Sequence, residues 1–138
     1  MRDYVEKYKI APEIRELSLS LVKHLPQKNF RAEVDALFKF VQNKIRYVKD
    51  IHDVETVQTP LKTLEYGQGD CDDKSTLLAA MLQSLGHPTR FHAMGFRPDN
   101  VSHVLLEVKR GNQWVALDAT EPVSMGWLPP GIKTSIYG

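Results

Sequence analysis

Apolar residues recur at helical spacing twice in the first third of the chain. The first series predicts a helix that starts near Pro12 and stops at Pro26; its members are Ile10, Ile14, Leu17, Leu21 and Leu25. The second series predicts an amphipathic helix over residues 31–47; its members are Val34, Leu37, Phe38, Val41, Ile45 and Val48. Residues 49–69 are polar and interrupted by proline and glycine, which predicts mostly loop.

A third helix is expected to begin at Cys71. Asp70 is a favourable N-cap residue, and Asp72 and Asp73 suit the positive electrostatic environment of a first helical turn. The residues that follow supply an apolar face and then a stop signal, in the order Leu77, Leu78, Met81, Leu82, Leu85, Gly86 and Pro88.

Three strand-like segments follow, at residues 89–96, 101–109 and 113–118. Gly111 and Asn112 separate the last two segments and form a plausible two-residue hairpin turn. The remaining tail is rich in glycine and proline, and we expect it to pack as coil with Trp127 and Leu128 as anchors.

Helices thus precede strands instead of alternating with them, which is typical of an α+β fold with an antiparallel sheet. A chain of 138 residues fits one domain with a substantial core. We therefore expect a single domain over residues 1–138. Within it, residues 1–48 form a helical part, 59–122 the core that carries the candidate chemistry, and 119–138 a coil tail.

Composition narrows the class of protein. The chain is 42% hydrophobic and 25% charged, with a formal net charge of +1, which is ordinary for a soluble globular protein and does not indicate a nucleic-acid partner. No apolar run is long enough for a membrane span, and the charged N-terminus does not resemble a signal peptide. One cysteine permits no internal disulfide, so we expect a reducing, cytoplasmic location.

That one cysteine, Cys71, could be a small buried hydrophobe, a metal ligand or a nucleophile. Its position on the first turn of a helix stabilises the thiolate, which is the reactive form. Asp70, Asp72 and Asp73 oppose this by like charge, so a nearby cation, typically a protonated histidine, would be needed.

The best placed of the five histidines is His103. Pairing the last two strands about Gly111 and Asn112 places Leu105 opposite Asp118. His103 and Asp118 then become diagonal neighbours on one face, with Cβ atoms about 7 Å apart or less. Such a pair suits a general base and its orienting acid, although a surface histidine and a strand-ending aspartate would give the same pattern, and a one-residue slip would separate them.

Three motifs together resemble the transglutaminase-like superfamily, within the wider papain-like cysteine enzymes. They are "GQGDCDDKSTLLAAMLQSLGHPTRF", "SHVLLEV" and "QWVALDAT", and the likeness covers about residues 59–122. In that family a cysteine opens a helix, a histidine begins a strand and an aspartate follows on the next strand. The resemblance places these roles on Cys71, His103 and Asp118, in the family's order.

The resemblance implies acyl transfer through a thioester on Cys71, with His103 moving the proton and Asp118 holding the imidazole. The backbone N–H of Cys71 would be the first oxyanion donor. Gln58, Tyr66 and Gln68 are candidates for the second donor, and Gln68 is preferred. We expect no resident cofactor. Some bacterial relatives use calcium beside the nucleophile, so a calcium ion near Asp70 is an alternative, whereas the spacing does not indicate zinc.

The favoured function is a cysteine peptidase or amidase that hydrolyses a protein or peptide. Protein cross-linking by transamidation is one alternative, because no residue decides whether water or an amine reaches the thioester. The other is a non-catalytic scaffold: the small size of the chain fits this, and compact versions of the family in phage genomes suggest virion assembly. The substrate and the oligomeric state are left open.

Overall fold

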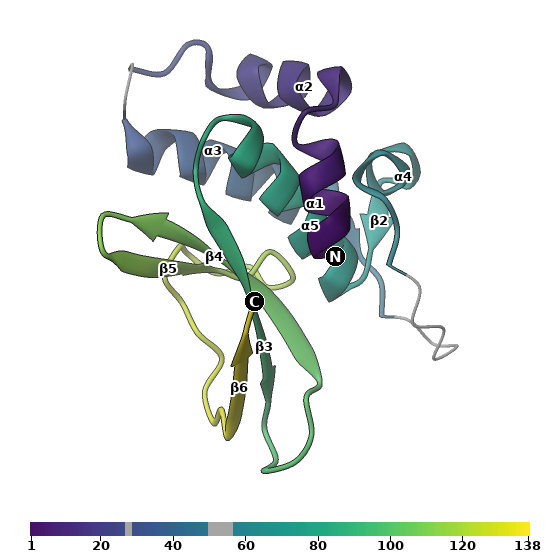
Figure 1. Cartoon of the computed structure of the whole chain (residues 1–138), viewed down its shortest axis with the longest axis vertical. Coiled ribbons are helices and arrows are strands. Elements are labelled where there is room, and N and C mark those ends of the chain that lie inside the picture. Colours follow the sequence, from purple (N-terminus) through teal and green to yellow (C-terminus); the bar gives the residue numbers. More distant parts are fainter. Residues whose placement is uncertain (27–28, 50–56) are drawn as a thin grey trace.

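A computed structural model describes residues 1–26, 29–49 and 57–138 of the chain. Within these residues five helices lie on one side of a small antiparallel sheet (Figure 1). The helices are α1 (Arg2–Tyr8), α2 (Pro12–Val22), α3 (Phe30–Lys44), α4 (Pro60–Tyr66) and α5 (Cys71–Ser84). The strands are β1 (Arg46–Tyr47), β2 (Gln68–Gly69), β3 (Thr89–Gly95), β4 (His103–Arg110), β5 (Gln113–Leu117) and β6 (Thr134–Tyr137). Helix α5 packs directly against strands β3 and β4 of the sheet. The predicted α+β class is therefore confirmed.

The three predicted helices correspond to α2, α3 and α5. Helix α3 stops at Lys44, three residues earlier than expected, because Ile45 adopts an extended conformation and leads into β1. Helix α4 corrects the prediction of a loop over residues 49–69. Thr59 caps it by accepting a hydrogen bond from Lys62 N–H, and Gly67 ends it in the left-handed conformation at φ 65°. Two turns are too short for periodicity to reveal.

The main sheet has the order β5-β4-β3-β6, and all of its neighbours are antiparallel. Strand β6 corrects the expectation that the whole tail is coil. Trp127 and Leu128 are also not anchors, because 36% and 45% of their surfaces are exposed. The tail is held instead by strand pairing, with His92 opposite Tyr137 and Met94 opposite Ser135.

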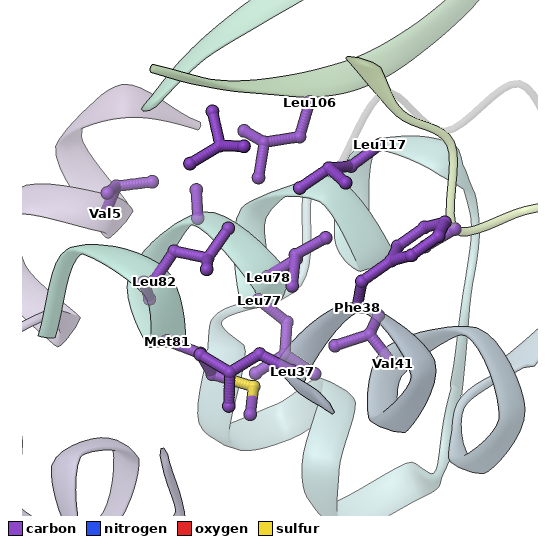
Figure 2. Packing of buried hydrophobic residues seen from close by; sticks show 14 of the residues in the cluster. Val5, Leu37, Phe38, Val41, Leu77, Leu78, Met81, Leu82, Leu106 and Leu117 are labelled. Carbon is purple, nitrogen blue, oxygen red and sulfur yellow. The ribbon is translucent and has the colours of Figure 1, made fainter. Parts of the chain in front are cut away.

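Helix α5 is the centre of the molecule (Figure 2). Its apolar residues from Leu77 to Leu82 are fully buried between the sheet and the other helices. The main core cluster around it includes Val5, Leu37, Phe38, Val41, Leu77, Leu78, Met81, Leu82, Leu106 and Leu117. The predicted stripe on α2 begins one turn later than expected, since Ile14 is buried but Ile10 is 77% exposed. None of the described helices combines the length and apolar character needed to cross a bilayer.

A two-residue parallel pair, β1 with β2, links the end of α3 to the start of α5. Arg46 N–H donates to Gly67 O at 2.8 Å, and Val48 N–H donates to Gly69 O at 2.9 Å. This pairing places Tyr47 beside Gly69, two residues before Cys71. It therefore fixes the segment that leads into the central helix.

Gly95 controls the return of the chain from β3 to β4. A Cβ atom at this position would overlap the carbonyl oxygen of Asn100, so only glycine lets the loop fold back this closely. The close approach allows Ser102 N–H to donate to Met94 O at 2.9 Å, and His103 then pairs with Met94.

We expect Gly95→Ala to lower the free energy of unfolding by about 2 kcal/mol or more, because the loop backbone must move. Urea unfolding followed by circular dichroism measures this. Gly138→Ala is the matched control, since a Cβ there meets no atom within 4 Å and its φ is not in the left-handed region. Equal stability of the two variants would contradict the steric account.

Candidate active site

Cys71 occupies the first turn of α5, and a reciprocal capping box fixes this turn. Asp73 N–H donates to Asp70 Oδ1 at 2.9 Å, and Asp70 N–H donates to Asp73 Oδ2 at 3.1 Å. The other oxygen of Asp73 accepts a hydrogen bond from Gln58 N–H at 2.7 Å. Burial raises the pKa of Asp73 to about 6, against the hydrogen bonds from these two backbone N–H groups, which lower it. The predicted N-cap role of Asp70 is confirmed.

Gly69 allows the strand before Cys71 to lie directly against the capping box. A Cβ on Gly69 would lie 2.6 Å from Cβ of Asp73, closer than real carbon atoms approach. The cysteine is consequently held at a sharp strand-to-helix junction. Its side chain is half-buried, and its Sγ lies 4.0 Å from Asp72 Oδ1.

His103 and Asp118 meet as the sequence predicts. The pairing of β4 with β5 aligns Leu106 with Leu117 and Val108 with Val115, which is the expected register. His103 Nε2–H donates to Asp118 Oδ2 at 2.8 Å. This bond leaves Nδ1 as the ring nitrogen available to a second partner.

Asp118 is almost completely buried, yet both of its oxygens have partners. Thr120 donates to Oδ1 twice, from its backbone N–H at 3.1 Å and from its hydroxyl at 2.6 Å. Burial alone would raise the pKa of Asp118, but the hydrogen bonds from His103 and Thr120 outweigh it and lower the pKa. Asp118 therefore stays ionised and keeps the imidazole oriented.

His103 lies between Asp118 and Cys71. The hydrogen bond with Asp118, followed by one with Cys71, raises the pKa of His103 to about 10, against the opposing effect of burial. The structure thus brings the three predicted residues together in one chain, Cys71–His103–Asp118. Their catalytic roles remain predictions.

Two further residues at the site, Tyr47 and Lys74, were not predicted from the sequence. Burial, and then the negative field of Cys71 and Asp70, raises the pKa of Tyr47, so its hydroxyl remains a hydrogen-bond donor. Lys74 is buried beneath the site, where its ammonium group donates to Ile45 O at 2.6 Å. Burial lowers the pKa of Lys74 to about 8, although the charge of Asp118 opposes this. The position of Tyr47 beside the site was not predicted, because residues 31–47 were expected to form one helix.

A cavity of about 360 Å³ opens beside the three-residue chain. Tyr47 and Lys74 line it together with the segment that follows Asp118, which contributes Ala119, Thr120 and Glu121. Cys71 is not among its lining residues, so the cavity adjoins the site through Tyr47, Lys74 and the segment after Asp118.

The candidates for a second oxyanion donor lie in different surroundings. Gln68 is exposed on β2, and Tyr66 is 57% exposed at the end of α4. Gln58 uses its backbone N–H for Asp73, and its Oε1 is buried without a hydrogen-bond partner among the described residues. The choice of Gln68 stays a prediction.

Metal binding near Asp70 also stays a prediction. Within residues 1–26, 29–49 and 57–138, no three His, Cys, Asp or Glu side chains gather in a way that could hold an ion. One carboxylate oxygen of Asp70 is already used in the capping box. The described donor set does not by itself make a calcium cage, because calcium takes six or more oxygens.

The remaining histidines lie elsewhere. His87 interacts with Glu33 at 3.1 Å, and His92 lies between Glu107 and Ser135 on the sheet. His24 is exposed, and His52 lies outside the described residues.

Comparison with known proteins identifies the family of the chain. A model of the transglutaminase-like superfamily matches residues 19–119, and the chain therefore belongs to that superfamily. Membership supports, in general terms, a cysteine-dependent peptidase or transglutaminase-like function. Among curated protein sequences none matches the chain.

Solved structures share the fold. A proposed cysteine protease from Cytophaga hutchinsonii superposes with a TM-score of 0.69 at 22% identity, over 91% of this chain and 42% of that one. A proposed protease from Parabacteroides distasonis gives 0.65 at 14% identity, over 82% and 25%. Calcium-bound LapG from Legionella pneumophila gives 0.66 at 18% identity, over 88% and 79%. The chain thus spans less than half the length of the first two proteins.

We expect the His103–Asp118 pair to make stability depend on pH between about 6.5 and 10. The folded-state pKa of His103 is raised from 6.5 to about 10, so the stabilisation is fully present below pH 6.5 and is lost as pH rises to 10. Its size is on the order of a few kcal/mol.

Urea unfolding across this range should be compared in Cys71→Ala and Cys71→Ala/His103→Gln, because the first change removes titration of the thiol itself. The bond to Asp118, the main cause of the shift, remains in Cys71→Ala. Parallel stability curves for the two proteins would show that the pair does not hold the proton.

Proposed function

We propose that this protein is a thiol-dependent acyl-transfer enzyme that cleaves amide bonds in a protein or peptide. The supporting observation is the set Cys71, His103 and Asp118, in which one imidazole is hydrogen-bonded to a buried carboxylate and has its pKa raised by that carboxylate and by a half-buried cysteine. This order of nucleophile, base and orienting acid is the arrangement that covalent catalysis requires.

The chemistry begins with a proton on His103 and a negative charge on Cys71. The sulfur attacks the carbonyl carbon of the substrate, and the resulting oxyanion collapses as the C–N bond breaks. His103 gives its proton to the leaving amine, which a cation beside the thiolate is placed to do. Water, deprotonated by the now neutral imidazole, then attacks the thioester and releases the acid.

The oxyanion needs donors near Cys71. The backbone N–H of Cys71 lies in the first turn of α5, where N–H groups have no partner within the helix. We propose the Tyr47 hydroxyl as a second donor, because it lies in the electrostatic field of Cys71 and lines the adjoining cavity. Gln68 is the alternative.

Transamidation uses the same thioester, with an amine in place of water. The negative charges of Asp70 and Glu121 near Tyr47 would attract a protonated amine as readily as a cationic peptide side chain. Hydrolysis is the favoured outcome, and the two are separated by adding a primary amine to the assay. A scaffold role predicts instead a stable complex that survives Cys71→Ala.

The decisive experiment measures alkylation of Cys71 by iodoacetamide near neutral pH, in wild type, His103→Ala and His24→Ala. We expect His103→Ala to slow alkylation by about tenfold or more, because the imidazolium that favours the thiolate is lost. His24 is an exposed histidine and serves as the matched control. Equal rates in all three proteins would overturn the ion pair and with it the proposed mechanism.

Activity is then screened with a peptide library, reading new chain ends by mass spectrometry with and without added amine. We expect Cys71→Ala to abolish cleavage, and Tyr47→Phe to lower kcat by about tenfold to a hundredfold if its hydroxyl binds the oxyanion. Gln68→Ala is the parallel variant. A larger loss in Gln68→Ala than in Tyr47→Phe would assign the donor to Gln68 instead.

A further inference from the structure

A second hydrogen-bonded chain of side chains lies on the sheet, apart from Cys71. His92 on β3, Glu107 on β4 and Ser135 on β6 project from the same face, because His92 pairs with Leu105 and Met94 pairs with Ser135. This face is opposite the one whose Val104, Leu106 and Val108 pack in the main core with α5. His92, Glu107 and Ser135 are separate from the residues of the Cys71 site.

The three side chains follow one another at hydrogen-bond distance. His92 Nδ1 lies 3.2 Å from Glu107 Oε2, and His92 Nε2 lies 2.9 Å from Ser135 Oγ. His92 and Glu107 are buried, with exposures of 3% and 6%, whereas Ser135 is exposed. A solvent-accessible hydroxyl is thus joined to a buried imidazole and a buried carboxylate.

The proton positions follow from the partners. Arg90 Nε donates to Glu107 Oε1 at 2.6 Å, and a glutamate carboxylate in such an ion pair can only accept. In neutral His92 the proton must therefore lie on Nδ1, facing Glu107. The lone pair of Nε2 then accepts the hydroxyl proton of Ser135, which is the geometry of a serine next to its base.

Aromatic rings hold these groups in place. The Tyr137 ring lies 4.4 Å from the His92 ring, centre to centre. The Arg90 guanidinium lies between two rings, 4.3 Å from Tyr137 and 4.4 Å from Trp114. The carboxylate and the imidazole are therefore fixed in orientation before any substrate arrives.

A backbone donor is also available at Ser135. Phe91 and Gly138 exchange hydrogen bonds of 3.1 and 3.0 Å, so the alternation of an antiparallel pair makes Ser135 a position that does not bond to β3. Since β6 is an edge strand of the described sheet, the N–H of Ser135 points outward. A nucleophile and an N–H group for an oxyanion thus belong to one residue.

We propose that Ser135, His92 and Glu107 form a second nucleophilic site that hydrolyses short acyl esters. Ser135 Oγ attacks the ester carbonyl carbon while His92 Nε2 takes the hydroxyl proton. The C–O bond then breaks, and His92 returns this proton to the departing alcohol, leaving Ser135 acylated. Water repeats the sequence with His92 as base, which releases the carboxylic acid and restores the serine.

The test uses the full chain carrying Cys71→Ala, so that the thiol cannot react. A biotin-tagged fluorophosphonate, whose fluoride is displaced by an activated serine, is added, and the modified residue is mapped by mass spectrometry. We expect label on Ser135, loss of label in Ser135→Ala, and about a hundredfold slower labelling in His92→Gln. Ser20→Ala is the matched control, because the exposed Ser20 hydroxyl donates to the backbone oxygen of Leu17 in its own helix.

Hydrolysis of 4-nitrophenyl acetate by the same proteins supplies the turnover readout. We expect release of 4-nitrophenol in Cys71→Ala and its loss in Cys71→Ala/Ser135→Ala. Circular dichroism checks each fold, and Glu107→Gln replaces His92→Gln if the latter unfolds. Label on another residue, no label at all, or equal turnover with and without Ser135 would overturn the proposal, and none of these results bears on Cys71.

Discussion

The first turn of α5 is the constraint on which the site depends. Asp70 and Asp73 satisfy each other's backbone N–H groups, and Asp73 also accepts from Gln58, so the carboxylate of Asp73 joins two segments of the chain to the start of the helix. Gly69 makes this convergence possible, because any side chain there would overlap Asp73. Since Cys71 lies inside this turn, the direction of its Sγ and of its N–H follows from the capping geometry and not from the cysteine itself.

The other charged groups of the site are buried, and each has partners that offset the free-energy cost of removing its charge from water. Asp118 is buried but accepts three hydrogen bonds, and the imidazole of His103, which donates one of them, compensates its negative charge. Lys74 is buried one turn after Cys71, and it occupies the carbonyl end of α3, where a cation is favoured. Removing one partner of a buried ion pair lowers the free energy of unfolding by more than the intact pair contributes to it, because the remaining charge is left without compensation.

The sequence revealed those parts of the fold that depend on local signals. The turn at Gly111 and Asn112 sets the register of β4 with β5, so the meeting of His103 with Asp118 could be predicted from strand alternation. The start of α5 could be predicted from its capping residues. Features that depend on distant pairing could not: β1 with β2, β6 on β3, and therefore Tyr47 beside the cysteine. Two-residue strands and two-turn helices carry no periodicity, and the burial of Lys74 depends on a carbonyl group that lies 29 residues away in the sequence.

The spacing of the three residues along the chain has a consequence for the order of assembly. His103 and Asp118 lie on neighbouring strands of one hairpin, which closes locally on a timescale of about microseconds. Cys71 joins them only when α5 docks on the sheet, through contacts between residues far apart in sequence, and such contacts form late. A nascent or partly folded chain can therefore carry the base and its acid together while the thiol is still separate. Enhanced reactivity of the sulfur then reports complete folding, whereas a chain interrupted before docking carries an ordinary, slowly reacting thiol.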